Sequence, residues 1–250
     1  MNIGTNAKVE TVEPSVFASL IAEEIAASIE ECIDDHGSCS LVLSGGSTPS
    51  SVYRLLSRPP FSDDIPWDKV HLFIGDDKWI FGEDSKTNIR MISETLLNHR
   101  KSPEANVHCL DMSLPSAKDS AEAYSNDIKR YFNLKDGETP AFDIVLLGVG
   151  ADGHIASVFP NSPLINDKTS IACAVENDGV ESVTLTPHVL FNGKRILILV
   201  RGRDKADVVQ QVLREREAAQ KLPIMLYKEA SDRVTWFLCS EAAQLLAGVL

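Results

Sequence analysis

Short apolar segments that alternate with helix-like stretches constrain the fold of this chain more than any other feature. The apolar segments are residues 40–44, 69–75, 107–110, 142–148, 195–200 and 234–240. Each has the length and the apolar content of a strand that is buried on both faces. Helical periodicity is found in residues 17–33, 49–57, 88–98, 116–132, 204–215 and 241–249. This alternation predicts an α/β fold with a mainly parallel sheet and helices on both faces.

Two further segments, residues 171–176 and 182–187, look like strands but have no helix between them. We expect them to pair with each other as short antiparallel strands at an edge of the sheet. The sequence contains no internal repeat, low-complexity tract or linker. With 44% hydrophobic residues the chain can bury a sizeable core, so we expect residues 1–250 to form one domain.

The charge of the chain narrows its range of partners. A formal net charge of -12 and a sequence pI near 4.9 oppose the binding of nucleic acid or of an anionic membrane. No apolar stretch approaches the roughly 20 residues of a membrane span, and the N-terminal residues lack a signal-peptide core. We therefore expect a cytoplasmic protein. Its five cysteines form no C-x-x-C pair and its six histidines show no metal-ligand spacing, which predicts reduced thiols and no metal site.

The first loop whose residues are suited to ligand binding is Ser44-Gly45-Gly46-Ser47-Thr48. It follows a predicted strand and comes just before Pro49. Proline suits the first turn of a helix, glycines let a ligand approach the backbone, and the first N–H groups of a helix attract anions. This pattern predicts a phosphate-binding loop. The alternative is a Gly-Ser turn that only caps the helix.

The second loop, "GVGADGHIASVFP" (residues 148–160), has the G-x-G-x-x-G spacing of a dinucleotide-binding loop. Two features argue against that function. Pro160 and Pro163 would end any following helix after at most about two turns, and Asp152 puts a negative charge where a pyrophosphate would lie. The glycines instead expose Asp152 and His154 at the end of a buried strand, a pairing typical of general acid–base catalysis. The alternatives are a buried or capping histidine and a carboxylate that braces the loop.

Two other loops carry charge directly after predicted strands. Asp76, Asp77 and Lys78 follow the strand at residues 69–75, and the alternative to a binding role is a solvated acidic turn. Arg203 and Lys205 lie between a strand and a helix, where a cation can meet an anionic ligand. The alternative there is exposed charge at a helix start, more so for Arg203 than for Lys205.

Four stretches together resemble the 6-phosphogluconolactonase family in order and spacing: "LSGGSTP", "GDDKWI…N" (ending at Asn88), "FDIVLLGVGADGHIASVFP", and "VTLTP" followed by "RILILVRGRDKA". The long glycine-containing stretch is the most specific of them. The resemblance implies a Rossmann-like fold, which the glucosamine-6-phosphate deaminases share. It also implies hydrolysis of 6-phosphoglucono-δ-lactone to 6-phosphogluconate, in the oxidative pentose phosphate pathway and without a cofactor. We expect a monomer whose partner is this small phosphosugar lactone.

The resemblance also implies roles for individual residues. His154 would be the catalytic base, with Asp152 beside it. Substrate and phosphate would be bound by Gly45, Gly46, Ser47, Thr48, Asp76, Lys78, Gly150 and Lys205. Because three of the loops follow separate strands, we expect Ser47, Asp76 and His154 to share one cleft at the carboxyl ends of neighbouring strands.

The chain departs from the family pattern at two positions. Family members usually have Asp-Glu-Arg where this chain has Asp76-Asp77-Lys78, and an arginine where this chain has Ser182. Lysine keeps the charge but loses the planar fork of a guanidinium, and serine loses the charge as well.

Two other functions stay open. An amino-sugar-phosphate deaminase or isomerase would share the D-G-H-I-A motif, but such enzymes resemble D-G-H-I-A-F-N-E-P, and their glutamate aligns with Phe159 here. A non-catalytic sugar-phosphate sensor would explain the missing arginines, although it would have no need of a base at His154.

Overall fold

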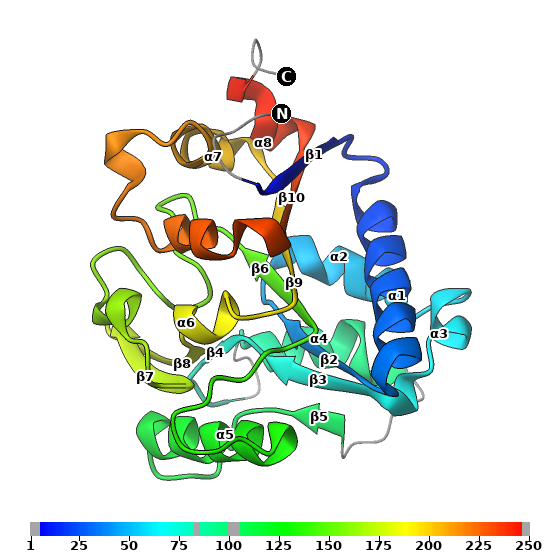
Figure 1. The fold of residues 1–250 in the computed structure, drawn as a ribbon, viewed down its shortest axis with the longest axis vertical. Helices are drawn as coiled ribbons and strands as arrows, with labels where there is room; N and C mark the ends of the chain where they lie inside the picture. The colour runs from blue at the N-terminus through cyan, green and yellow to red at the C-terminus, as the bar shows by residue number, and fades with distance from the viewer. Residues whose placement is uncertain (1–5, 83–85, 100–105, 247–250) are drawn as a thin grey trace.

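Seven strands form the central sheet, and every neighbouring pair in it is parallel (Figure 1). The structure is a computed structural model and describes residues 6–82, 86–99 and 106–246. The strands, in spatial order, are β1 (Lys8–Val12), β10 (Val234–Cys239), β9 (Arg195–Val200), β6 (Ile144–Gly148), β2 (Cys39–Leu43), β3 (Val70–Ile74) and β5 (Val107–His108). The six strands predicted from the apolar segments are all present, and no end shifts by more than two residues.

One face of the sheet is covered by three helices, and Figure 1 shows α1 and α2 side by side on it. These are α1 (Phe17–His36), α2 (Ser47–Leu56) and α4 (Asn88–Thr95); α3 (Phe61–Asp64) packs at their margin. Successive residues of a strand point to opposite faces. Leu41 and Leu43 of β2 accordingly pack against this layer, whereas Val42 belongs to the core on the other face.

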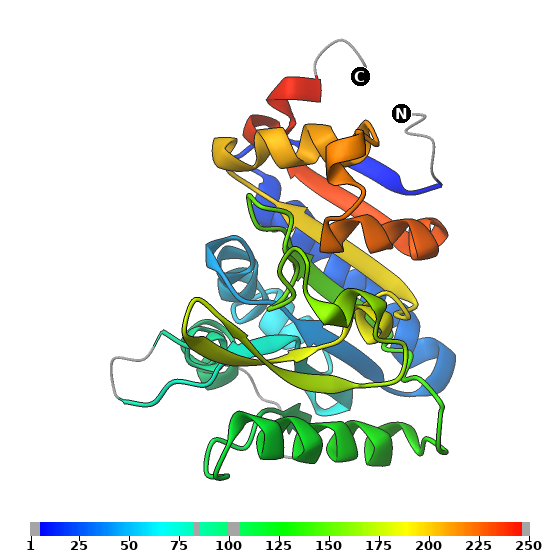
Figure 2. The same ribbon diagram turned by 90° about the vertical axis from the view of Figure 1, so that its left-hand side faces the viewer.

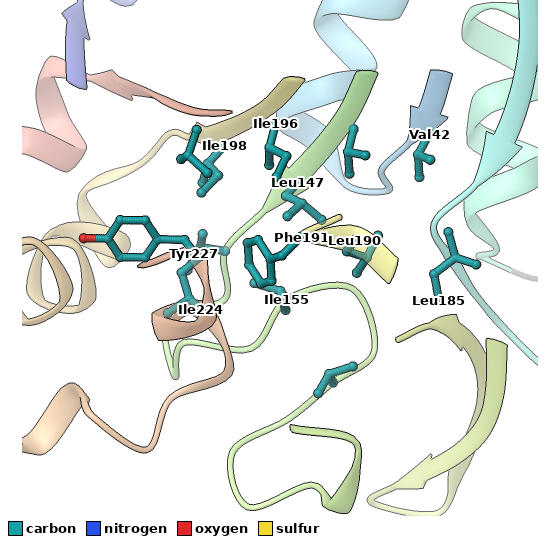
Figure 3. Packing of buried hydrophobic residues seen from close by; sticks show 14 of the residues in the cluster. Val42, Leu147, Ile155, Leu185, Leu190, Phe191, Ile196, Ile198, Ile224 and Tyr227 are labelled. Atoms are coloured by element: carbon teal, nitrogen blue, oxygen red, sulfur yellow. The ribbon is translucent and has the colours of Figure 1, made fainter. Parts of the chain in front are cut away.

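The other face is covered by four further helices, namely α5 (Ala117–Phe132), α6 (Pro187–Leu190), α7 (Ala206–Leu213) and α8 (Ser240–Ala243). The described part of the chain also contains the 3₁₀ segments Trp67–Lys69, Leu97–His99, Pro163–Asn166, Arg203–Lys205, Glu217–Ala219, Pro223–Arg233 and Gln244–Leu246. Figure 3 shows how the core on this face joins distant segments, with Ile155 of the glycine-containing loop close to Phe191. Fully buried Ile155 thus anchors that loop to the sheet.

A second, three-stranded antiparallel sheet packs against this face and stands in the foreground of Figure 2. It consists of β4 (Asp76–Lys78), β8 (Val180–Leu185) and β7 (Ala172–Asn177), in that order. The two strands expected at an edge of the main sheet do pair with each other antiparallel, but in this separate sheet. Residues 76–78, read as a loop in the sequence, are its third strand because β8 supplies them with a partner.

Two other segments differ from the sequence-based expectation. Strand β1 was not predicted. The last predicted helix is two short helical pieces up to residue 246, and residues 247–249 lie outside the described part of the chain. Within the described residues, no helix combines the length and the apolar character that a membrane crossing needs.

Candidate active site

The loops that follow β2, β3 and β6 meet in one cleft of about 430 Å³, because these three strands are neighbours in the sheet. Ser47, Asp76 and His154 all line this cleft, as the order of the strands requires. Eight of the predicted site residues line it: Gly45, Gly46, Ser47, Thr48, Asp76, Gly150, His154 and Lys205. Asp152 and Lys78 do not.

The amino end of α2 forms one wall of the cleft. Gly46 precedes the helix with φ 96°, a backbone conformation that glycine adopts without strain. No side chain caps the helix, and its first turn contains no acidic residue. The backbone N–H groups of this turn therefore face the cleft without a competing carboxylate, which is the arrangement that binds phosphate.

Gly45 lets a second residue reach this wall. A Cβ at position 45 would lie 2.0 Å from Oδ1 of Asn88, so only glycine leaves room for that side chain. Asn88 lines the cleft and its Nδ2 donates to the carbonyl oxygen of Asp76 at 2.7 Å. Asn88 was not predicted to be a site residue, although it is the asparagine that ends the "GDDKWI…N" stretch of the family resemblance.

His154 and Asp152 form a hydrogen-bonded pair at the end of β6. Nδ1 of His154 lies 2.6 Å from Oδ1 of Asp152, which also accepts the backbone N–H of residue 154 at 3.2 Å. Partial burial would raise the pKa of Asp152, but these hydrogen bonds and the nearby imidazole hold it below its usual range. The carboxylate therefore stays ionised and orients the imidazole ring.

The turn that carries this pair is closed by backbone hydrogen bonds. Gly150 donates to the carbonyl oxygen of His154 at 2.9 Å, and Gly153, with φ 84°, donates to that of Gly150 at 3.0 Å. The ring of Phe159 lies 4.8 Å from the imidazole, centroid to centroid. The glycines thus shape a tight turn that presents His154 to the cleft, and no dinucleotide-type helix follows them.

Asp76, on β4, lines the same cleft. Its Oδ2 accepts the hydroxyl of Ser157 at 2.7 Å, and Asn88 Nδ2 lies 3.3 Å from its Oδ1. Burial raises the pKa of Asp76 to about 6, and the hydrogen bond from Ser157 opposes that rise. Asp76 is therefore a carboxyl group that changes charge close to neutral pH.

Asp77 has a structural role instead. It is 2% exposed and accepts three backbone N–H groups, from Lys78 at 2.8 Å, Asn88 at 2.6 Å and Ile89 at 2.8 Å. Burial raises its pKa, and these backbone hydrogen bonds oppose the rise. For Asp77 the alternative of a solvated acidic turn is therefore wrong. The side chain is buried and accepts backbone N–H groups at the start of α4.

Two cations line the cleft from the connection between β9 and α7, namely Arg201 and Lys205. Nζ of Lys205 lies 3.2 Å from Oδ2 of Asp204. Arg203 is exposed and does not line the cleft, as the alternative of exposed helix-start charge expects. Arg201 was not predicted to be a site residue, although its position directly after an apolar strand was a usable signal.

Lys78 and Ser182, the two departures from the family pattern, lie opposite each other in the β4–β8 ladder. They share a face of that small sheet with Asp76, since side chains alternate along a strand. Lys78 is exposed and Ser182 is 7% exposed. Neither lines the cleft.

The chain is similar in sequence and in fold to proteins of known function. A profile described as "Glucosamine-6-phosphate isomerases/6-phosphogluconolactonase" matches residues 13–236. The chain is 28% identical to a 6-phosphogluconolactonase of Synechocystis sp. over 89% of its length and 90% of that protein's. It is 29% identical to one of Thermotoga maritima, with 89% and 94% covered. The solved 6-phosphogluconolactonase of Trypanosoma brucei matches with a TM-score of 0.81 at 26% identity, over 97% of this chain and 100% of that one. The chain belongs to the glucosamine-6-phosphate isomerase/6-phosphogluconolactonase family.

Proposed function

We propose that this protein hydrolyses 6-phosphoglucono-δ-lactone to 6-phosphogluconate. The observation that carries the proposal is the combination of two features in one cleft. A histidine paired with a carboxylate lies at the end of β6, and an uncapped helix start with two cations lies beside it. The first can activate water, and the second can hold a phosphate.

The chemistry follows from the tautomer that Asp152 favours. With Nδ1–H donated to Asp152, the Nε2 lone pair of His154 is free to accept a proton. His154 takes that proton from a water molecule as its oxygen attacks the lactone carbonyl carbon. The tetrahedral intermediate then breaks its bond to the ring oxygen, which receives the proton from the imidazolium. The new carboxylic acid ionises in water, so each turnover releases one proton, and no covalent enzyme intermediate forms.

The phosphate would bind away from the reacting carbon. The amino end of α2, from Gly45 to Thr48, and Lys205 supply the donors. Phosphate contacts of this kind hold the lactone at a fixed position relative to His154. The phosphate does not react, but the free energy of its binding is used to orient the lactone carbonyl for attack.

The relatives support this substrate. The Synechocystis and Thermotoga proteins are named 6-phosphogluconolactonases, and the similarity covers at least 89% of this chain in both cases. A deaminase is less well supported. The resemblance implies a glutamate for that reaction at position 159, and the apolar ring of Phe159 packs against His154 there.

The direct test is a lactonase assay. Freshly generated 6-phosphoglucono-δ-lactone is mixed with the protein, and proton release is followed against the spontaneous rate and against the His154→Asn variant. We expect wild-type protein alone to accelerate hydrolysis. If it does not, but releases ammonia from glucosamine 6-phosphate, the protein is a deaminase. If it binds sugar phosphates without turning over either compound, it is a sensor.

A further inference from the structure

Arg201 is placed at the cleft by the pairing of two strands. Gly148 of β6 pairs with Leu199 of β9, so the residue two positions after Leu199 emerges beside the loop that carries His154. The chain then turns at Gly202, with φ 102°, into the 3₁₀ segment Arg203–Lys205. Arg201 and Lys205 line the cleft from either side of this turn, whereas Arg203 does not.

The amino end of α2 lies close to the same end of β9. Although α2 follows β2, it also contacts β9, and Ser47 and Thr48 line the cleft together with Arg201. The catalytic pair and Asp76 come from β6 and β4 instead. The cleft therefore has a cationic part, at α2 and the β9–α7 connection, and an acid–base part around His154.

The net charge of the residues that line the cleft depends on Arg201. Asp76 and Asp204 contribute two carboxylates to the lining, and Arg201 and Lys205 contribute two cations. Lys205 already has Asp204 at 3.2 Å. The side chain of Arg201 makes no hydrogen bond or ion pair with any residue that the structure describes. Without Arg201 the cleft of this strongly acidic chain would carry net negative charge, which would oppose a phosphate dianion.

We propose that Arg201 binds the phosphate group of the substrate, together with Lys205 and the amino end of α2, and that it sets the preference for a phosphorylated sugar over the unphosphorylated one. This inference rests on the proposed function of the cleft. A guanidinium fits two phosphate oxygens at once, which an ammonium cannot do. Arg201 thus supplies a forked donor that neither Lys78 nor Ser182 brings to the cleft lining.

The test measures binding, independently of turnover. The affinities of 6-phosphogluconate and of gluconate, which lacks the phosphate, are measured by titration calorimetry for the wild type, Arg201→Ala, Arg201→Lys and Arg203→Ala. We expect Arg201→Ala to weaken 6-phosphogluconate binding by roughly 10-fold or more, the loss typical of a charge-assisted hydrogen bond, and to leave gluconate binding unchanged. The affinity of Arg201→Lys for 6-phosphogluconate should lie between those of the wild type and Arg201→Ala, since lysine keeps the charge but not the two forked donors.

Arg203→Ala is the matched control. Arg203 is an arginine two residues after Arg201, and its side chain is exposed and lies outside the cleft lining. It should bind both compounds like the wild type. The inference is overturned if Arg201→Ala binds 6-phosphogluconate normally, if both variants lose equal affinity, or if the wild type does not prefer 6-phosphogluconate to gluconate. Phosphate binding that depends on Arg201, in a protein that hydrolyses no lactone, would refute the proposed function and leave this inference standing.

Discussion

Nδ1 of His154 lies 2.6 Å from Oδ1 of Asp152, and the contact depends on the absence of a side chain at residue 150. A Cβ there would lie 2.1 Å from Nδ1 of His154 and 2.5 Å from Oδ1 of Asp152. Both distances are far below van der Waals contact, so any other residue would push the pair apart. The second glycine of the motif, Gly150, therefore serves the geometry of an acid–base pair.

Replacing His154 by asparagine removes the titrating base and keeps a polar side chain of similar size. We expect kcat for lactone hydrolysis to fall by roughly 10²–10⁴-fold, while the affinity for 6-phosphogluconate changes little. Steady-state kinetics and calorimetric titration check the two parts. A variant that hydrolyses lactone at the wild-type rate would rule out His154 as the base.

Replacing Gly150 by alanine should separate His154 from Asp152 without removing either group. Because Gly150 does not have a positive φ, the backbone tolerates alanine, and the loss arises from the clash with the pair. We expect kcat to fall roughly 10-fold or more, since small displacements of a catalytic base are costly. A Gly150→Ala variant that keeps the wild-type kcat would contradict this explanation.

The ionisation of buried Asp76 should make the stability of the folded protein depend on pH. Burial raises its pKa to about 6 in the folded protein, above the ordinary value of 3.8, so the folded state binds this proton more tightly than the unfolded state. Its contribution to stability is therefore lost as the pH rises through about 6. Asp76→Asn, which cannot ionise, should raise Tm at pH 8 and have a smaller effect at pH 5, by calorimetry. An equal change in Tm at both pH values would contradict the prediction.

His71 predicts a pH effect of the opposite sign. Its Nδ1 lies 3.1 Å from Nε2 of His108, whose Nδ1 lies 2.6 Å from Oδ2 of Asp127. Burial, and then the neighbouring His108, lower the pKa of His71 below its ordinary 6.5. The unfolded state therefore binds this proton more tightly, and stability is lost as the pH falls below about 6.5.

The variant His71→Gln keeps a hydrogen-bonding side chain at this position without a titrating ring. The decrease in Tm between pH 7.5 and pH 5.5 should be smaller in this variant than in the wild type. His188→Gln is the control, because His188 hydrogen-bonds Thr139 instead. If Tm decreases as much in His71→Gln as in the wild type over this pH range, the protonation of His71 does not account for the loss of stability at low pH.

The sequence alone determined the elements that depend on local pattern. Strands such as β2, in which every residue is buried, appear as apolar runs, and α5 appears in the spacing of its apolar residues. The position of Ser47 and His154 in the loops that follow such strands was readable for the same reason. Because parallel strands place their carboxyl ends at one edge, this local information also predicted a shared cleft.

The tertiary structure decided the features that depend on distant partners. β1 has only Val12 buried and is a strand because β10 pairs with it, more than 200 residues along the chain. Residues 76–78 form a strand because β8 lies beside them. Arg201 lines the cleft because β9 pairs with β6, and Asp77 is buried because the start of α4 packs on it. Periodicity reports which face of an element is apolar, but it does not report which element lies beside it, and in these segments the neighbour determines the structure.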